Sequence, residues 1–278
     1  MALTEAVRPS VHHDCPITID GIGGFLAGPA NVIMQLALAP VGYGVLESKV
    51  ESGQVTRHPL KRFRTTFTYI SVALYGDEAE RAAYRDAVNS SHRLVRSDAN
   101  SPVKYNAFDK DLQLWVAACL YYGAVDIVEK LHGPMADAQA DAFYRYAARF
   151  GTTLQVPEQM WPADRAAFAS YWDEMVAQVH IDDAVREYLL MITTRERMPP
   201  VMRGSTRFNV WITTGFLPQR FRDEMRLTWT DTDQQRFEKL LRRIGAAQRW
   251  LPAIVRRFPF NWFLWDLRAR IRFNRRLV

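Results

Sequence analysis

The segment DKDLQLWVAACLYYGAVDIVEKL, residues 109–131, decides the fold. Its apolar residues recur at helical spacing but cover nearly every side of the predicted helix, and only a few charges interrupt them. A helix that is apolar almost all round must be enclosed by other elements, because no face of it favours water. Gly133 is suited to end the helix just after His132. We therefore expect this helix at the centre of the core.

The rest of the chain repeats the helical spacing, and the alternation typical of strands is scarce. We predict an all-α fold: a flexible N-terminus over residues 1–19, one multi-helix domain over 20–248, and a basic aromatic tail over 249–278. Further helices are expected near residues 59–75, 77–96, 136–150, 162–179, 182–195, 218–226, 231–246 and 260–272, with Asp77, Gly151 and Pro162 at helix ends and a loop at 198–206.

An early stretch, GIGGFLAGPANVIMQLALAPVGYGVL (residues 21–46), carries no charge. Its length alone would permit a membrane span. Glycines crowd its ends, however, and Pro29 and Pro40 bracket a shorter helix with Pro29 near the first turn. We interpret it as a buried helix of a soluble core, and membrane insertion is the alternative.

The net charge of +6 resides near the C-terminus. Residues 249–278 hold eight arginines against one acid, Asp266, which gives +7 there and leaves about −1 for the first 248 residues. Large aromatic residues alternate with these arginines, a pattern that suits an anionic membrane surface better than nucleic acid. In the alternative, the aromatics pack onto the domain and the arginines are solvated.

Several classes of protein are disfavoured by what the sequence lacks. Cys15 and Cys119 are too few and too far apart for a disulfide framework or a CxxC metal clip. The motifs of nucleotide-binding proteins, serine hydrolases and zinc hydrolases are missing. The N-terminus shows no secretory signal, so we expect a cytoplasmic protein, and peripheral attachment to the membrane stays open.

His92 is the first candidate for chemistry. It shares one helical stripe with Tyr84, Val88, Ser91 and Val95, so its imidazole should face inward. A buried histidine needs a carbonyl, a carboxylate or a metal for its polar nitrogens. From position alone, a hydrogen-bonded core histidine and a metal or haem ligand both remain open.

The segment HPLKRFRTTFTYISVALYG, residues 58–76, is the second candidate. Arg62 and Thr66 lie one helical turn apart, so together they can present a guanidinium and a hydroxyl to one ligand. The alternative is a first turn whose basic residues are solvated and whose threonines bond back to the helix.

Five segments in this order make the chain similar to a known family. They are GFLAGPANVIMQLALAPVGYGV, RFRTTFTYISVALYG, HRLV, YNAFDKDLQLWV and GFLPQRFRDEMRLTWTDTDQQRFEKLLRRIGAAQRWLPAIVRRFP. From about residue 20 to 260 the chain resembles the MpaB and rubber-oxygenase family, which includes the catalytic domain of latex-clearing proteins. The resemblance implies an all-α fold with a globin-like core and a slot for non-covalent haem b.

The resemblance also implies roles for particular residues. It makes His92 the axial iron ligand, and it places Arg62 and Thr66, or in another register Arg64 and Thr68, in the site. Glu47 lies near the position of a proposed catalytic base. The segment after the histidine matches the family at Tyr105, Ala107, Asp109, Leu112 and Trp115, and the early segment matches at Gln35, Gly44 and Val45.

These residues suit a haem, which needs an inward imidazole, an apolar slot and nearby cations. His92, the helix at 109–131 and Arg62 or Arg64 can supply them, and the Asp109 carboxylate can accept a hydrogen bond from the imidazole N–H on the other ring nitrogen. The chain departs from the family at two places. Leu38 stands where many relatives have a histidine, and Thr65 where rubber oxygenases have a lysine on the distal side of the iron.

Three hypotheses follow. The first is a haem-b-dependent oxygenase that uses O2 on a hydrophobic, possibly isoprenoid, substrate. The second is a haem-free, membrane-associated binding or scaffold protein of the same family, which the two departures leave open. The third is a non-haem metal enzyme that uses His92 with Asp109 or Glu47.

Overall fold

A computed structural model describes residues 15–50 and 58–278, and within them it confirms the all-α prediction. Apart from one isolated bridge, Arg96 to Asn106, these residues form no β-structure. The helices are α1 (Gly21–Leu36), α2 (Ala39–Leu46), α3 (Pro59–Tyr75), α4 (Glu78–His92), α5 (Lys110–His132), α6 (Asp137–Ala147), α7 (Arg149–Thr152), α8 (Arg165–Ala177), α9 (Asp183–Thr194), α10 (Pro200–Arg203), α11 (Thr206–Phe216), α12 (Gln219–Glu224), α13 (Asp231–Gln248), α14 (Ala253–Arg256) and α15 (Phe260–Arg272), with a 3-10 turn at Glu158–Met160.

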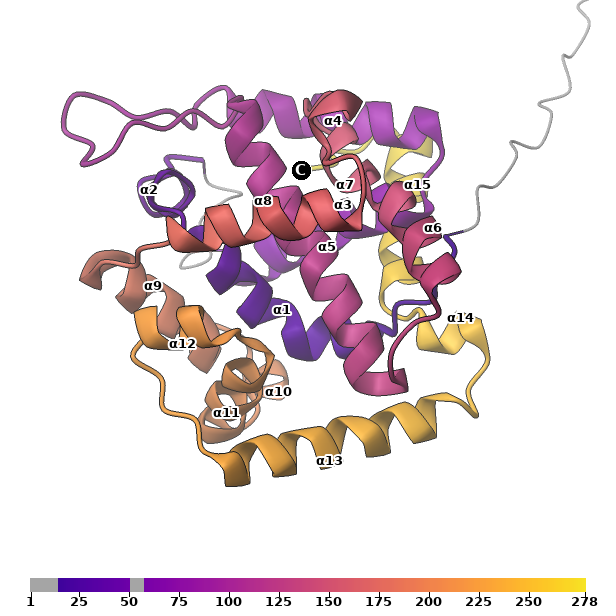
Figure 1. Ribbon diagram of the computed structural model, residues 1–278. Helices are drawn as coiled ribbons and strands as arrows, with labels where there is room; N and C mark the ends of the chain where they lie inside the picture. The colour runs from indigo at the N-terminus through magenta and orange to yellow at the C-terminus, as the bar shows by residue number, and fades with distance from the viewer. Residues whose placement is uncertain (1–14, 51–57) are drawn as a thin grey trace, which may run out of the picture.

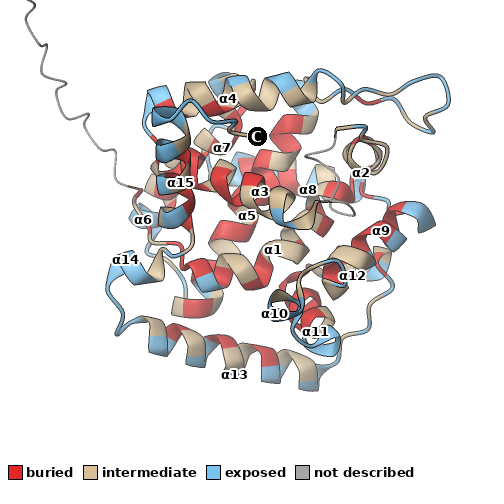
Figure 2. Ribbon diagram, turned by 180° about the vertical axis from the view of Figure 1, so that it is seen from behind, coloured by how far each residue is buried: buried red, intermediate tan, exposed pale blue. Residues whose placement is uncertain are grey.

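Helix α5 is central, as its composition predicts. The Asp109 carboxylate accepts hydrogen bonds from two backbone N–H groups of its first turn, and Gly133 ends it at a φ of 89°. The helix packs against α1, α7 and α13. Figures 1 and 2 show it enclosed by its neighbours and largely buried. The globin-like arrangement that the resemblance implies stays a prediction.

The prediction for the early glycines was wrong. Helix α1 begins at Gly21, and Pro29 lies inside it rather than in its first turn. A Cβ at Gly23 would come within 2.4 Å of Ile127 in α5, and one at Gly24 within 2.8 Å of Phe260 in α15. The glycines therefore permit close helix packing instead of ending the helix.

Other helix boundaries differ from the predicted ones, in some cases because a capping side chain sets the end of the helix. Asp77 forms the capping box of α4 as expected, but α4 ends at His92 rather than at residue 96. Pro162 is not in the first turn of α8, because the side chain of Asp164 caps that helix. Helix α11 was missed: its aromatic and β-branched residues hide a helix that Ser205 caps.

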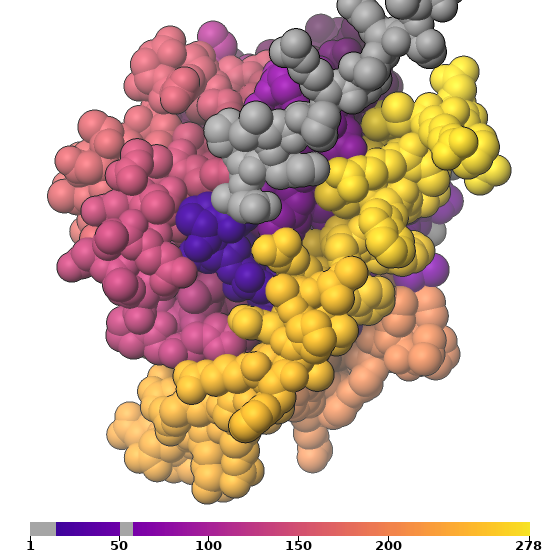
Figure 3. Space-filling view, turned by 90° about the vertical axis from the view of Figure 1, so that its right-hand side faces the viewer, coloured from indigo at the N-terminus to yellow at the C-terminus, as the bar shows by residue number. Residues whose placement is uncertain are grey.

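Residues 15–19 and the C-terminal segment both pack on the domain. Ile17 and Ile19, assigned to the flexible N-terminus, are buried in the core. Residues 1–14 lie outside the described residues. In the predicted tail, α15 packs on α3, and the Arg268 guanidinium pairs with Glu80 of α4 at 2.6 Å. Figure 3 shows this segment lying along one face of the molecule.

By length and composition, α5 is the one described helix that could cross a membrane, and 67% of its most apolar window is buried. Helices α1 and α2 pass the same test only as a pair, and they are bent by 110°. Both segments are accounted for as core helices.

Candidate functional site

Two cavities lie side by side in the middle of the fold. The first, which we call the histidine cavity, has a volume of about 250 Å³ and is lined by His92, Arg62 and Tyr105 among others. The second, the apolar cavity, has a volume of about 210 Å³ and is lined by α1, α3, α5, α9 and their neighbours. They share a wall formed by Gln35, Leu36, Val45, Arg62, Thr66 and Phe150.

His92 ends α4 and turns its ring into the histidine cavity, as its stripe predicts. Its Nδ1 atom is buried and has no hydrogen-bond partner among the described residues. Burial, assisted by the positive charge of Arg62, lowers the pKa of His92 to about 4. The imidazole is therefore neutral at pH 7, which is the form that binds a metal.

Arg62 and Thr66 of α3 both reach the shared wall, which supports their register over Arg64 and Thr68. In the described parts of the chain, the Arg62 guanidinium has no ion-pair partner. Thr65 also lines the histidine cavity, but its hydroxyl donates to the Arg62 carbonyl at 3.0 Å.

The loop after α4 adds a hydrogen-bonded cluster. Tyr105 lines the histidine cavity, and its hydroxyl donates to Glu47 Oε2 at 2.7 Å. Ser101 Oγ donates to the same oxygen at 2.7 Å. Burial and the bond to Glu47 raise the pKa of Tyr105 to about 12, so the phenol keeps its proton. Glu47 itself does not line either cavity, so it touches the site through Tyr105.

The structure does not bring three other predicted residues to the histidine cavity. Arg64 donates to the Leu277 carbonyl at 3.0 Å and lies 3.6 Å from Asp266. Asp109 caps α5 at an exposed position and makes no bond with His92. Trp115 is fully buried, and its indole N–H donates to the Gln35 carbonyl at 3.1 Å, so it supports the shared wall from behind.

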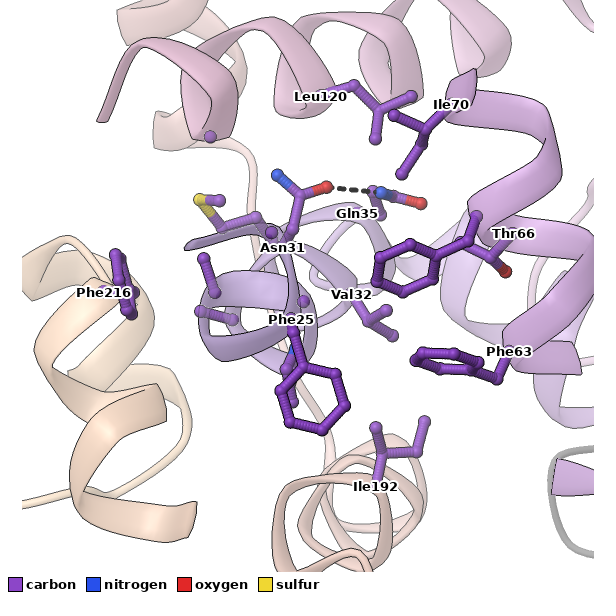
Figure 4. A pocket seen from close by; sticks show the side chains of 18 of the residues that line it. Phe25, Asn31, Val32, Gln35, Phe63, Thr66, Ile70, Leu120, Ile192 and Phe216 are labelled. Atoms are coloured by element: carbon purple, nitrogen blue, oxygen red, sulfur yellow. Dashed lines mark hydrogen bonds between the residues drawn. The ribbon is translucent and has the colours of Figure 1, made fainter. Parts of the chain in front are cut away.

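Sequence reasoning missed the apolar cavity, which Figure 4 shows. Phe25 and Val32 of α1 face Phe63 of α3, and Leu120 and Ile192 come from α5 and α9. Its members are spread over 200 residues, and only the charge-free stretch at 21–46 hinted at it.

Polar groups on the apolar cavity are few and mostly paired. Gln35 donates to Asn31 Oδ1 at 2.6 Å, and Asn31 donates to the Cys119 carbonyl at 2.6 Å. Asp126 pairs with Lys130 of the same helix. Burial raises the pKa of Asp126, and Lys130 opposes that shift.

Arg195, like Arg62 on the shared wall, has no acidic partner among the described residues. It follows α9 and lines the apolar cavity. Its guanidinium lies over the Phe25 ring, 4.3 Å from the centroid, and donates to the Phe25 carbonyl at 3.2 Å. That carbonyl lacks its helical donor because Pro29, four residues on, has no N–H. Arg195 makes no ion pair within the part of the chain that the structure describes.

Across residues 15–50 and 58–278, no group of three or more His, Cys, Asp or Glu side chains could hold a metal ion. The third hypothesis needs His92 beside Asp109 or Glu47, and those carboxylates are engaged elsewhere. A lone histidine in a cavity fits an iron whose other ligands come from a porphyrin.

Fold and site define an all-α protein in which a histidine-bearing cavity adjoins an apolar one. The chain belongs to the family described as ER-bound oxygenase mpaB/B'/Rubber oxygenase, catalytic domain, whose sequence model matches residues 16–250. Its relatives include the uncharacterized proteins Rv2237 of Mycobacterium tuberculosis and Mb2261 of Mycobacterium bovis. Each is 53% identical over 250 residues, which cover 90% of this chain and 98% of the relative. No solved structure matches the chain.

Proposed function

We propose that the protein is a haem-b-dependent oxygenase that acts with O2 on a hydrophobic substrate such as an isoprenoid, with His92 as the residue that would hold the haem iron. The observation that carries the proposal is a neutral imidazole in a cavity, with a buried nitrogen that no described group satisfies. Membership of an oxygenase family supports the reaction class.

The residues of the histidine cavity fit a haem. The walls of the histidine cavity include the apolar side chains of Val45, Val88, Leu112 and Val116. Apolar side chains suit the flat faces of a haem macrocycle. Arg62 offers a guanidinium to a propionate or another anionic group. When bound, haem iron would supply the activation of O2.

The chain itself supplies positioning and proton control. Thr66 and Gln35 present polar groups at the boundary between the two cavities. The Tyr105 hydroxyl keeps its proton and donates it in a hydrogen bond to Glu47 Oε2. Glu47 therefore influences the cavity indirectly, by fixing the orientation of the Tyr105 hydroxyl. Apolar side chains line most of the rest of the site and disfavour water there.

The test is an absorption spectrum of purified protein titrated with haem. Wild-type protein should show a Soret band with saturable binding, and His92→Ala should lose it. His180→Ala is the matched control, because the His180 side chain is 73% exposed and outside both cavities. A wild-type protein that stays colourless after titration contradicts the proposal.

A membrane-associated binding role without haem is the second candidate, and the surface of the C-terminal segment favours it. Trp250, Phe258, Trp262, Trp265 and Phe273 are between 50% and 89% exposed, close in sequence to several arginines. Exposed aromatics beside arginines suit an anionic membrane surface.

Flotation with phosphatidylserine vesicles tests this candidate. Replacing Trp250, Trp262 and Trp265 by serine should abolish flotation, whereas His92→Ala should leave it intact. Flotation without any haem binding by the wild-type protein would favour this role over the oxygenase, and absence of flotation would remove it.

A further inference from the structure

We propose that the apolar cavity binds a single-chain amphiphile whose anionic headgroup, a carboxylate or a phosphate, pairs with Arg195. The inference rests on the proposed function insofar as it makes this ligand the oxygenase substrate. The binding itself does not require haem.

The body of the apolar cavity suits a hydrocarbon chain. Aromatic and aliphatic side chains from α1, α3, α5 and α9 form its walls (Figure 4). A Cβ placed on Gly28 would meet no atom within 4 Å, although Gly28 lies in the middle of a packed helix. This side of α1 therefore borders open space that a ligand can fill.

Arg195 marks the headgroup end. Its stacking on Phe25 and its bond to the Phe25 carbonyl fix the guanidinium while occupying one of its N–H groups. Burial lowers the pKa of Arg195, which reflects the cost of holding this charge away from water. No acid among the described residues compensates it, and Asp126, the acid that lines the cavity, is already paired with Lys130.

An anionic ligand would remove that cost. A carboxylate or phosphate accepts charge-assisted hydrogen bonds from a guanidinium, and a neutral alcohol gains much less. Arg197 is exposed and lines the same cavity, so this end reaches the surface. With its headgroup there, the chain can extend to the wall of Gln35 and Thr66 that the histidine cavity shares.

The experiment titrates haem-free and haem-loaded protein with oleate, dodecyl phosphate and oleyl alcohol, with binding followed by calorimetry. Gly28→Leu fills the cavity, and Gly28→Ala is its matched control. Arg195→Gln removes the charge. Arg207→Gln is the control for it, because Arg207 is exposed and outside the cavity.

At least one anionic probe should bind the wild-type protein, and oleate should bind about tenfold more tightly than oleyl alcohol if the carboxylate is the headgroup. Gly28→Leu should abolish binding and Gly28→Ala should keep it. Arg195→Gln should erase the preference for the anion over the alcohol, a ratio that a purely structural role of Arg195 would not change.

Failure of both anionic probes to bind the wild-type protein overturns the proposal, and so does a preference that survives Arg195→Gln. The haem spectrum of the same samples is independent of these results. A protein that binds haem but no anionic amphiphile refutes this inference alone, and one that binds the amphiphile but no haem refutes the oxygenase proposal.

Discussion

The two cavities differ in what their walls can do. The histidine cavity contains groups with fixed protonation, namely a neutral His92 and a protonated Tyr105 anchored on Glu47. The apolar cavity has mostly hydrocarbon walls, and the half-buried Arg195 on it has no acidic partner among the described residues. Under the proposed function, the reaction would take place in the histidine cavity and the substrate chain would lie in the apolar cavity. Gln35, Arg62 and Thr66 belong to the wall that the two cavities share.

The largest change in the free energy of unfolding should come from protonating His92 in haem-free protein. Its folded pKa of about 4 lies below the ordinary value near 6.5, so the unfolded chain binds the proton more readily. The stability associated with neutral His92 is complete above pH 6.5 and declines as pH falls toward 4, by up to about 3 kcal/mol.

Urea unfolding of wild type and His92→Gln between pH 4 and 8 measures this difference. The free energy of unfolding of wild type should fall more steeply below pH 6.5 than that of the variant. Parallel curves would mean that His92 is not held neutral by burial.

The apolar cavity offers a smaller test. A Cβ at Gly123 would lie 2.3 Å from Asn31 Nδ2, which donates to the Cys119 carbonyl. Gly123→Ala should therefore displace the Asn31 amide, and the loss should exceed the gain in helix propensity by about 1–2 kcal/mol. Chemical unfolding measures the change. A stabilised variant would show that the Asn31 side chain can move aside without losing stability.

Tyr105→Phe addresses the histidine cavity with a change of about 1 kcal/mol. It removes one hydrogen bond to Glu47 and leaves the ring in place. Ser101→Ala removes the other bond to the same oxygen and is the matched comparison. If haem binds, Tyr105→Phe should perturb its spectrum more than Ser101→Ala, because Ser101 does not line the cavity. Equal spectra would remove Tyr105 from the site.

The smallest predicted effect is an increase in the free energy of unfolding. Gly28→Ala adds a methyl group where there is open space, so it should stabilise α1 by about 0.5–1 kcal/mol. Thermal unfolding checks the prediction. A destabilised Gly28→Ala would show that the space beside Gly28 is not available.

The sequence predicts well those features that depend on residues close to one another in the chain. The composition of α5, the capping box at Asp77 and the stripe that carries His92 all depend on residues within a few turns. Early glycines were misread because their reason lies in distant partners, Ile127 and Phe260.

The choice between Arg62 and Arg64 shows the same limit. The two residues are two positions apart on α3 and point to different sides, and only the packing of α15 and Leu277 explains where Arg64 goes. The apolar cavity could not be predicted, since its walls come from helices that are far apart in the sequence.

Chemical rescue with free imidazole tests directly whether His92 is the residue that binds the haem iron. His92→Gly leaves room for a free imidazole, so haem titrated into this variant should give no native-like Soret band until imidazole is added. Imidazole should restore the wild-type spectrum in a saturable way, whereas His180→Gly should need no rescue. A wild-type spectrum in His92→Gly without imidazole would contradict the assignment of His92 as the iron ligand.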